Sequence, residues 1–521
     1  MFLAQAPAAP LEVPSVDYAA VLPMLIVFGV ACIGVLVEAF APKATRWGIQ
    51  VTISLVAIIA AGVSLILYAT GSSSSKAGTT TFSGSISVDR PSLFLWGTLL
   101  LLGLGAVFLI ADRKVEAGGA FVAQAAIRPG TVQDRAQSAT TSQTEVFPLT
   151  LFALGGMMTF CAANDLLTMF IALEVLSLPL YLMCGLARRR RLISQEAAVK
   201  YFLLGAFSSA FFLYGLALLY GYADSVKLAD IAHAAAGSDR SDTLLFAGLG
   251  LLVVGLLFKG SVGPFHTWTP DVYQGAPTPV TGFMAACTKV AAFGAILRVL
   301  SVGFSSTSWE WRGVMWAVAI ISMALGAILG LTQTDVKRMI AYSSVAHAGF
   351  LLVGAIAMTE DGLSSTLFYL LAYGFTTLAA FGVVSLVRDS SGEATHLSAW
   401  AGLAKRSPLL AGVFTFLLLA LAGIPLTSGF VGKFVVFSAA LSDGMAPLVV
   451  VALVFSAVAA FFYLRVIVLM YFSEPAADGP TVTVPGGFTT AAIALGVVVT
   501  LVLGVLPAFA LDWAGAGGFA S

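Results

Sequence analysis

The chain reads Leu256-Leu-Phe-Lys259-Gly-Ser-Val-Gly-Pro264-Phe-His266 in the middle of an apolar run that extends from residue 243 to residue 272. Pro264 has no backbone N–H group and Gly260 and Gly263 loosen a helix, so the stretch predicts a helix broken beside Lys259. Within a lipid bilayer, backbone groups freed by such a break persist only where protein or water satisfies them. The stretch therefore predicts a buried, water-accessible pocket around Lys259.

A second apolar run, from residue 408 to residue 441, has the same kind of interruption. It reads Gly423-Ile-Pro425-Leu-Thr-Ser-Gly429-Phe-Val-Gly-Lys433, with the lysine now after the break. Three more charged side chains stand isolated in apolar runs, namely Glu174, Lys200 and Lys289. A charge near the centre of a bilayer costs roughly 3 kcal/mol on insertion scales, so a membrane chain retains such residues mainly for ion or proton traffic. The four lysines and the glutamate predict a proton or cation pathway.

The composition is that of an all-α polytopic membrane protein. Of the 521 residues, 59% are hydrophobic and 10% are charged, against about 25% charged residues in an ordinary soluble domain. The 26 basic and 26 acidic residues balance, so no basic excess indicates a nucleic-acid partner. Apolar runs of about 20 residues can cross a bilayer as helices. Fourteen such runs are predicted, with approximate limits 20–40, 49–70, 91–111, 146–162, 165–187, 195–222, 243–272 (broken), 277–301, 313–332, 336–357, 363–387, 408–441 (broken), 446–472 and 487–509.

Basic residues predict the orientation of these helices, because cytoplasmic loops carry an excess of lysine and arginine. The loops and span ends of one side carry fifteen of them: Lys43, Arg46, Arg113, Lys114, Arg128, Arg135, Arg188, Arg189, Arg190, Arg191, Lys337, Arg338, Arg388, Lys405 and Arg406. The other side carries six: Lys76, Arg90, Lys227, Arg240, Arg298 and Arg312. This asymmetry predicts that both termini lie outside the cytoplasm and that the polar stretch 112–145 is a cytoplasmic loop.

Two copies of a five-helix unit are predicted, in residues 146–301 and 302–472. Three pairs of segments align in order: Tyr201-Phe-Leu-Leu-Gly-Ala-Phe-Ser-Ser209 with Tyr369-Leu-Leu-Ala-Tyr-Gly-Phe-Thr-Thr377, the break at Pro264 with that at Pro425, and Asp165 with Asp335. Because five is odd, the second copy must cross the membrane in the opposite direction. Inverted repeats with paired broken helices are how many transporters build a site at the membrane midplane. The remainder is an N-terminal segment 1–19, three helices in 20–111, and a C-terminal part 473–521 with one helix.

The isolated charges can carry protons. Burial favours the neutral amine of a lysine over its ammonium ion, so Lys259, Lys289 and Lys433 can accept and release a proton near neutral pH. Glu174 is the expected counter-charge, because its approach to Lys259 stabilises the ammonium ion and its withdrawal favours proton release. Lys200 lies near the cytoplasmic start of its run, where it can either reach the surface or take part in transport.

Two of the four histidines are placed for proton relay. His266 follows the first break, and His347 lies in the middle of its run. Imidazole changes its charge between about pH 5 and pH 8, although a hydrogen-bonded structural histidine is the alternative in both places. Nearby hydroxyl groups can hold ordered water or make ordinary interhelical hydrogen bonds. They belong to Tyr342, Ser343, Ser344, Tyr369, Tyr373, Thr376 and Thr377.

No metal, iron–sulfur cluster, nucleotide or flavin is expected on this chain. Its cysteines lie singly in apolar runs, without a CxxC pair or histidines at ligand spacing, and are interpreted as packing residues. They are Cys32, Cys161, Cys184 and Cys287. The sequence contains neither a P-loop nor a dinucleotide-binding glycine fingerprint.

These residues lie in motifs of a known family. The motifs are Ile171-Ala-Leu-Glu174-Val-Leu-Ser-Leu-Pro-Leu-Tyr181, Lys200-Tyr-Phe, Lys259-Gly-Ser-Val-Gly-Pro-Phe-His266-Thr-Trp-Thr-Pro-Asp271, Lys289, Lys337-Arg-Met-Ile-Ala-Tyr-Ser-Ser344 and Gly429-Phe-Val-Gly-Lys433-Phe. With them the chain resembles, over nearly its whole length, the antiporter-like membrane subunits of respiratory complex I. It is most similar to the N type of bacterial NADH-quinone oxidoreductase. Lysine at 433 differs from the M type, and the lateral helix of the L type is missing after the last run.

The resemblance implies coupling of NADH oxidation and quinone reduction elsewhere in a complex to proton translocation through this chain. Glu174 and Lys259 resemble the family's controlling pair, Lys289 its central lysine, Lys433 the residue facing the outer exit, and Lys200 a further lysine of N-type subunits. FMN, iron–sulfur clusters and quinone are then expected on partner subunits. The implied partners are the other membrane subunits, including other antiporter-like ones, and the lipid of a bacterial plasma (inner) membrane.

Two other functions stay open at the level of sequence. A subunit of a multisubunit cation/proton antiporter would have the same repeat and related lysines. A structural membrane subunit would use its buried charges to hold a complex together without carrying protons.

Overall fold

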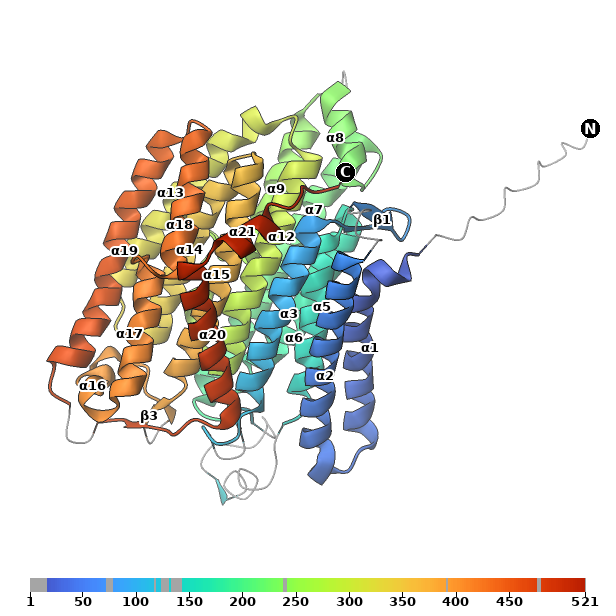
Figure 1. The fold of residues 1–521 in the computed structure, drawn as a ribbon. Coiled ribbons are helices and arrows are strands. Elements are labelled where there is room, and N and C mark those ends of the chain that lie inside the picture. The colour runs from blue at the N-terminus through green and yellow to red at the C-terminus, as the bar shows by residue number, and fades with distance from the viewer. Residues whose placement is uncertain are drawn as a thin grey trace, which may run out of the picture.

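The computed structural model describes residues 16–71, 78–116, 119–122, 131–132, 143–237, 241–389, 392–475 and 479–520. In this part of the chain, long helices run roughly parallel in one bundle (Figure 1). Two small antiparallel sheets, β1–β2 and β4–β3–β5, lie at its ends. The architecture confirms the predicted all-α polytopic membrane class.

The first half of the bundle is built from nine helices and one hairpin among the described residues. They are α1 (Tyr18–Phe40), α2 (Lys43–Thr70), β1 (Thr79–Thr81), β2 (Ile86–Val88), α3 (Arg90–Ala111), α5 (Val146–Ala162), α6 (Leu166–Cys184), α7 (Arg191–Ala223), α8 (Leu228–Gly237), α9 (Thr243–Lys259) and α10 (Trp268–Gly275). One continuous helix follows, made of α11 (Thr278–Phe283), the π-helical turn η2 (Met284–Thr288), α12 (Lys289–Arg298) and the π-helical turn η3 (Val299–Gly303).

The second half continues in the same bundle. Its elements are α13 (Ser308–Thr332), α14 (Val336–Ile356), α15 (Glu360–Val384), β3 (Val387–Asp389), β4 (Gly392–Glu393), η4 (Leu397–Trp400), α16 (Leu403–Arg406), α17 (Pro408–Ala422), α18 (Ser428–Ser442), α19 (Ala446–Phe472), β5 (Thr481–Val482), α20 (Gly487–Val505) and α21 (Ala508–Ala514).

The helices correspond to the predicted apolar runs. Among the described residues, eleven helices are long and apolar enough to cross a membrane, and four shorter apolar helices accompany them. The shorter ones are α5, α9, and the pair α17 and α18 that forms the second broken run. Because length and composition alone carry this correspondence, the count of fourteen spans and the predicted domain limits stay predictions.

Three helices lie inside the bundle and are covered by the others. The helix of residues 278–303, α14 and α15 are buried along almost the whole of their apolar windows, whereas α7, α19 and α20 are buried along only a third. A helix that is apolar all round belongs in the interior of a helical assembly. The interior helices carry Lys289 and His347, so these two side chains are enclosed by protein.

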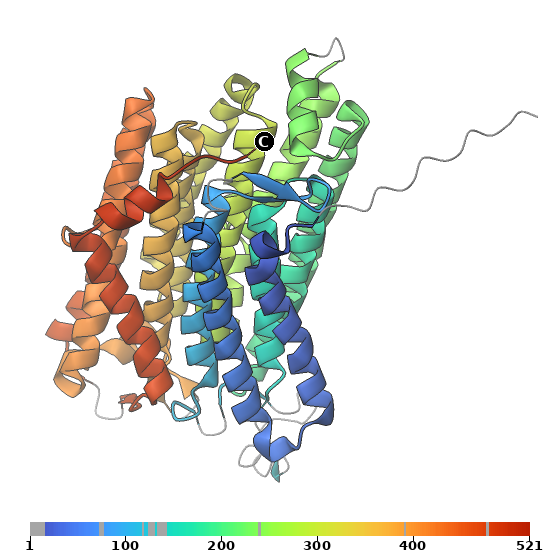
Figure 2. The same cartoon turned by 45° about the vertical axis from the view of Figure 1, so that its right-hand side comes forward.

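The bundle has two distinct ends. The β1–β2 hairpin, α8 and α21 lie at one end, and α16 and β3 lie at the other (Figures 1 and 2). The second end also carries Arg188 to Arg190, Lys337 and Arg388, so it is named the arginine-rich end. It is the end that the basic residues predict to be cytoplasmic. Much of the predicted loop 112–145, with Arg128 and Arg135, lies outside the described residues, as do Lys76 and Arg240.

Two of the basic residues that were assigned to loops or span ends, Arg298 and Lys337, form ion pairs inside the protein. Arg298 has no exposed surface and pairs with Asp89 through Nη2 at 2.9 Å. Lys337 is 1% exposed and pairs with Glu393 at 3.3 Å. Distant carboxylates hold these two side chains inside the protein, and the predicted orientation stays a prediction.

Several local features agree with the predicted inverted repeat. Asp165 caps α6 by accepting from Thr168 N–H, and Asp335 caps α14 by accepting from Arg338 N–H. Each of the two aspartates also forms an isolated antiparallel bridge, Asp165 with Lys227 and Asp335 with His396. Both predicted breaks are present, between α9 and α10 and between α17 and α18. The inversion itself stays a prediction.

Candidate buried lysine site

Lys259 is the last residue of α9 and lies at the first break. Its Nζ donates to Ser177 Oγ at 2.7 Å and to Tyr201 OH at 3.0 Å. It also lies 5.6 Å from the ring centroid of Tyr181. Its polar partners are therefore hydroxyl groups on α6 and α7.

Glu174 lies on the same helix as Ser177 and is partly exposed. The Glu174 carboxylate interacts electrostatically with Lys259 and with Tyr181. No ion pair within 4.0 Å joins it to Lys259 in the described structure. Its Oε1 atom is buried without a hydrogen-bond partner. Ser177 and Tyr181, the α6 residues that Lys259 contacts, lie one and two turns further along the helix than Glu174.

Lys289 lies in the interior helix, directly after the π-helical turn η2. Its Nζ donates to Gly260 O at 3.2 Å and to Ser344 O at 2.7 Å. The first of these carbonyls belongs to the broken helix. The sequence predicted freed carbonyls beside Lys259. One of them is the carbonyl of Gly260, the residue next to Lys259, and it binds Lys289.

His347 lies on α14, one turn beyond Ser344. Its Nδ1 is 2.6 Å from Tyr369 OH and its Nε2 is 3.3 Å from Tyr463 OH. It interacts electrostatically with both Lys289 and Lys433. The ring is thus placed between two lysines that come from different helices.

Lys433 on α18 closes the series at the second break. Its Nζ donates to Leu421 O at 3.1 Å, to Ala422 O at 2.9 Å and to Ser456 Oγ at 3.0 Å. The two carbonyls end α17, where Gly423 adopts a left-handed φ of +86°. His347 also lies beside the Leu421 carbonyl. Lys433 and His347 therefore share one backbone oxygen.

The three buried lysines share an environment. Each donates to uncharged oxygens and lies near an aromatic ring, at 5.0 Å from Tyr201 for Lys259, 5.5 Å from Tyr373 for Lys289 and 5.1 Å from Phe350 for Lys433. Aromatic faces attract cations at such distances. None of the three pairs with a carboxylate within 4.0 Å in the described part of the chain. Hydroxyls, carbonyls and rings tolerate either protonation state of an amine, whereas a carboxylate contact fixes the charged one.

Lys200 is not part of this series. Its side chain is 42% exposed and pairs with Glu196 and Asp271, each at 2.7 Å. Asp271 in turn accepts from Arg338 Nη1 at 2.6 Å. The structure places Lys200 in a surface network at the arginine-rich end.

His266 is buried beyond the first break. Its ring lies 6.0 Å from that of Tyr342, and its Nδ1 has no hydrogen-bond partner among the described residues. No contact joins it to the three lysines in the hydrogen-bond network of that region. Its predicted relay role stays a prediction.

The sequence did not identify the partners that hold the lysines. Ser177 lies three residues after Glu174 and so shares a helix face with it, which is the sequence signal that could have identified it. Tyr201 was noted only as a repeat marker, yet it binds Lys259. Tyr369 was also named among the hydroxyl groups near His347, and it binds His347. The π-helical turn before Lys289 has no sequence signal, because residues 284–288 contain neither glycine nor proline.

The described residues contain no group of three or more histidine, cysteine, aspartate and glutamate side chains that could hold a metal ion. The four cysteines are free thiols, three of them buried. The side chains that the structure brings together at this site are amines, an imidazole and hydroxyl groups.

Comparison with known sequences identifies the family. The family described as "NADH:quinone oxidoreductase/Mrp antiporter, TM" matches residues 163–473. The NADH-quinone oxidoreductase subunit N of Saccharopolyspora erythraea is 76% identical over 514 residues, which cover 98% of this chain and 99% of the relative. That of Acidothermus cellulolyticus is 60% identical over 502 residues, which cover 96% of each chain.

Solved structures agree with this assignment. A chain of respiratory complex I from Thermus thermophilus with bound aureothin superposes with a TM-score of 0.76 at 34% identity, over 95% of this chain and all of that one. A chain of the Mrp complex from Dietzia sp. DQ12-45-1b shares the fold, with a TM-score of 0.81 at 22% identity over 96% of each chain. The chain therefore belongs to the antiporter-like membrane subunits of NADH:quinone oxidoreductase and Mrp antiporters, and within that family to the N-type subunits of complex I.

Proposed function

We propose that this chain translocates protons across a bacterial plasma membrane as the N-type subunit of NADH-quinone oxidoreductase, driven by quinone reduction elsewhere in the complex. Protons pass from Lys259 to Lys289, then by way of His347 to Lys433. Glu174 adjusts the charge of Lys259 at the input. FMN, iron–sulfur clusters and quinone belong to partner subunits.

The observation that carries the proposal is the continuity of contacts between the three lysines. Lys259 adjoins Gly260, whose carbonyl binds Lys289 Nζ at 3.2 Å. Lys289 reaches α14 at Ser344, one turn before His347. His347 and Lys433 meet at the Leu421 carbonyl. Proton transfer needs donors and acceptors within hydrogen-bond reach or one water apart. The carbonyls hold the amines and the imidazole in series across both broken helices, and water molecules between these groups carry the proton.

The glutamate acts without direct contact in this arrangement. No ion pair joins Glu174 to Lys259 among the described residues, so the carboxylate shifts the balance between amine and ammonium through space. Its partial exposure lets a neighbouring subunit change that influence. Coupling of this kind requires two conformations of the site that differ in how strongly Glu174 stabilises the Lys259 ammonium ion.

The orientation follows from the basic residues. With the arginine-rich end in the cytoplasm, both termini lie on the outer side and α18 leads from the second break toward the outer face. Lys433 is then the last lysine before the exit.

The first experiment separates this function from that of a cation/proton antiporter. A tagged chain is purified from its own membranes, and flavin absorbance, iron–sulfur signals and NADH-driven acidification of reconstituted vesicles are measured. Copurified flavin and iron–sulfur subunits with NADH-driven acidification are expected. Sodium/proton exchange without these partners and without a response to NADH contradicts the proposal.

The second experiment separates proton transfer from a structural role. Lys259→Met removes the amine but leaves a side chain of similar length, so complex assembly is retained while NADH-driven acidification falls by at least about tenfold, as expected for loss of a proton-transfer group. Lys405→Met is the matched control, because Lys405 forms an exposed ion pair with Glu474. Normal pumping by an assembled Lys259→Met complex indicates a structural role.

A further inference from the structure

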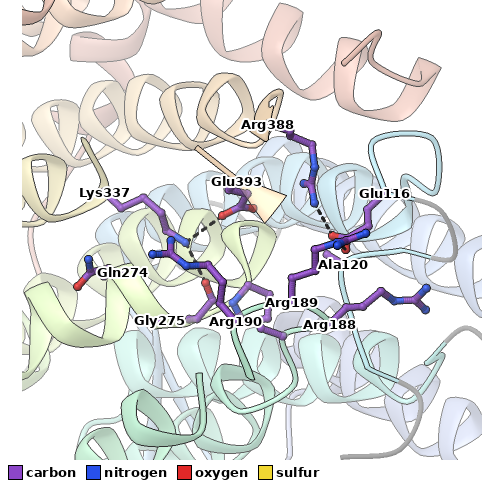
Figure 3. A pocket seen from close by; sticks show the side chains of 13 residues that line it. Glu116, Ala120, Arg188, Arg189, Arg190, Gln274, Gly275, Lys337, Arg388 and Glu393 are labelled. Carbon is purple, nitrogen blue, oxygen red and sulfur yellow. Dashed lines mark hydrogen bonds and ion pairs between the residues drawn. The ribbon is translucent and has the colours of Figure 1, made fainter. Parts of the chain in front are cut away.

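A small polar cavity opens at the arginine-rich end and has no part in the lysine series described above. Its volume is about 30 Å³, which is enough for one or two water molecules. The lining includes Glu116, Arg388, Arg189, Lys337 and Glu393. The Glu393 side chain is 18% exposed, whereas that of Lys337 is 1% exposed. Figure 3 shows the Lys337 and Glu393 side chains pointing toward one another across this space.

The two carboxylates of the cavity differ in how firmly they are held. Glu116 is bound by two guanidinium groups, Arg388 Nη2 at 2.8 Å and Arg189 Nε at 3.2 Å. Glu393 has a single charged partner, Lys337 at 3.3 Å. Arg190 also lines the cavity, and it donates to Thr395 Oγ1 at 3.2 Å. Among the described residues, Glu393 is therefore the carboxylate of this cavity with fewer charged partners.

A hydroxyl group links Glu393 to Lys337 in a second way. Thr278 Oγ1 donates to Glu393 Oε2 at 2.5 Å and accepts from Lys337 Nζ at 3.0 Å. Thr278 is 1% exposed and begins the interior helix that carries Lys289. The three groups form a short hydrogen-bonded row that runs from the cavity into the protein.

The row leads toward the lysine series. Lys337 and Ser344 are seven residues apart on α14, which places them on one face about 10 Å apart. Ser344 supplies the carbonyl that binds Lys289, and its own hydroxyl is buried without a partner. The hydroxyls of Tyr273 and Ser261 lie in the same interval as that of Ser344. Buried hydroxyls of this kind are commonly satisfied by ordered water.

We propose that Glu393, Thr278 and Lys337 form the cytoplasmic entrance of the proton path. The inference rests on the proposed function. Glu393 Oε2 takes one proton from water in the cavity. With Lys337 neutral, the protonated Glu393 donates to Thr278 Oγ1, and the hydrogen of Thr278 turns to Lys337 Nζ. One proton leaves Glu393 and one arrives at Lys337, so the carboxylate is restored and an ammonium ion forms, ready to pass its proton toward Ser344 and Lys289.

The predicted repeat makes this entrance one-sided. At the offset that pairs Asp165 with Asp335, the position of Lys337 corresponds to Leu167 in the first copy, at the opposite end of the bundle. Leu167 is an exposed apolar side chain. The corresponding position therefore lacks the lysine, as expected if the entrance serves uptake from only one side.

The test is Thr278→Val in the assembled complex, because valine keeps the shape of threonine and removes only the hydroxyl. Assembly is expected to be normal, while NADH–quinone turnover and NADH-driven acidification of inverted vesicles fall by at least about tenfold. Thr278→Ser restores the hydroxyl and recovers at least half of the rate. Thr281→Val is the matched control. Thr281 lies one turn further along the helix than Thr278, and among the described residues its hydroxyl donates only to backbone carbonyls. The turnover of this variant stays within about twofold of wild type.

A second variant keeps the proposal testable if Thr278→Val does not assemble. Glu393→Gln removes the proton acceptor, so turnover is expected to fall more steeply with rising pH than in wild type, and Glu393→Asp recovers part of the rate. The groups that face Glu393 are Lys337 on α14, Arg388 on β3, Arg188 to Arg190 before α7, and Glu116. Glu116→Gln should keep the wild-type pH profile, because two arginines hold that carboxylate.

Two outcomes overturn the inference. One is an assembled Thr278→Val complex that pumps within twofold of wild type, and the other is a wild-type pH profile for Glu393→Gln. Lys289→Met, measured in parallel, tells which claim has failed. If Lys289→Met stops pumping while Thr278→Val does not, only the entrance is misplaced. If Lys289→Met also pumps normally, the proton path itself is wrong.

Discussion

Buried lysines in this chain fall into two kinds at the scale of single residues. Lys259, Lys289 and Lys433 donate only to hydroxyls and carbonyls, whereas Lys337 also has a carboxylate partner. An amine among neutral acceptors can hold or lose its proton at a modest difference in free energy, because no buried carboxylate is left unpaired when it becomes neutral. The absence of an acid beside the three lysines among the described residues is therefore a property suited to proton transfer.

Lys200 provides a contrasting prediction at the residue scale. It is partly exposed and pairs with Glu196 and Asp271, and such ion pairs contribute about 0 to 1 kcal/mol. Lys200→Gln is expected to lower NADH–quinone turnover by no more than about threefold and to leave the amount of assembled complex unchanged. A loss of pumping as large as that of Lys259→Met would place Lys200 in the path.

The residue-scale part of the site was only half accessible from sequence. Isolation in an apolar run identified Glu174 and the three buried lysines, because a charge in a bilayer is costly wherever it lies. Contact partners depend on how helices approach one another, so Ser177 and Tyr201 could not be assigned to Lys259. Lys337 was counted only among the basic residues of loops and span ends, and its partner Glu393, which lies 56 residues further along the chain, could not be assigned to it.

At the scale of elements, the two broken helices present carbonyl groups to lysines. The Gly260 carbonyl at the first break binds Lys289, and the Leu421 and Ala422 carbonyls at the second break bind Lys433. Glycine and proline predicted both breaks because they weaken helices locally. The run limits were equally predictable, since 146–162 and 446–472 match α5 and α19 to the residue. Packing alone decides which lysine meets which carbonyl.

Gly423 tests the second break. Its φ of +86° disfavours any side chain, and an added Cβ would lie 3.0 Å from Lys433 Cδ and 3.2 Å from its Nζ. Gly423→Ala is expected to destabilise the chain by about 1 to 2 kcal/mol through backbone strain and to slow pumping by displacing the amine. Thermal inactivation in detergent and NADH-driven acidification measure the two effects.

Gly412→Ala is the control for that substitution. Gly412 lies in the same helix α17, and an added Cβ meets nothing within 4 Å. It should leave stability and pumping near wild type. Equal effects of the two substitutions would show that the break geometry is unimportant.

At the scale of the whole molecule, one buried ion pair ties distant segments together at the end opposite the arginine-rich end. Arg298 ends α12, Asp89 caps α3, and Asp89 also accepts from the Ala520 N–H at 3.1 Å. Arg298 donates further to Ser92 Oγ at 2.7 Å and to Cys161 O at 3.0 Å. The pair thus joins the N-terminal helices, the interior helix and the C-terminal tail.

Removing one member of this pair should damage the fold rather than the chemistry. Asp89→Asn leaves the Arg298 charge buried without a counter-charge, which is expected to cost about 3 to 5 kcal/mol. The amount of assembled complex on native gels falls accordingly, while each assembled complex keeps its turnover. Arg312→Gln, which breaks the partly exposed pair with Asp443, should cost less than about 1 kcal/mol. Normal assembly of Asp89→Asn would show that the pair is dispensable.

The central claim for the whole molecule is that Lys289 carries protons between the two broken helices. Its most direct measurement is NADH-driven acidification of inverted membrane vesicles that contain Lys289→Met, together with NADH–quinone turnover and the amount of assembled complex. Lys405→Met serves as the control for the same change at an exposed site. The account predicts normal assembly with acidification and turnover reduced by at least about tenfold. Normal assembly with unchanged acidification would contradict it.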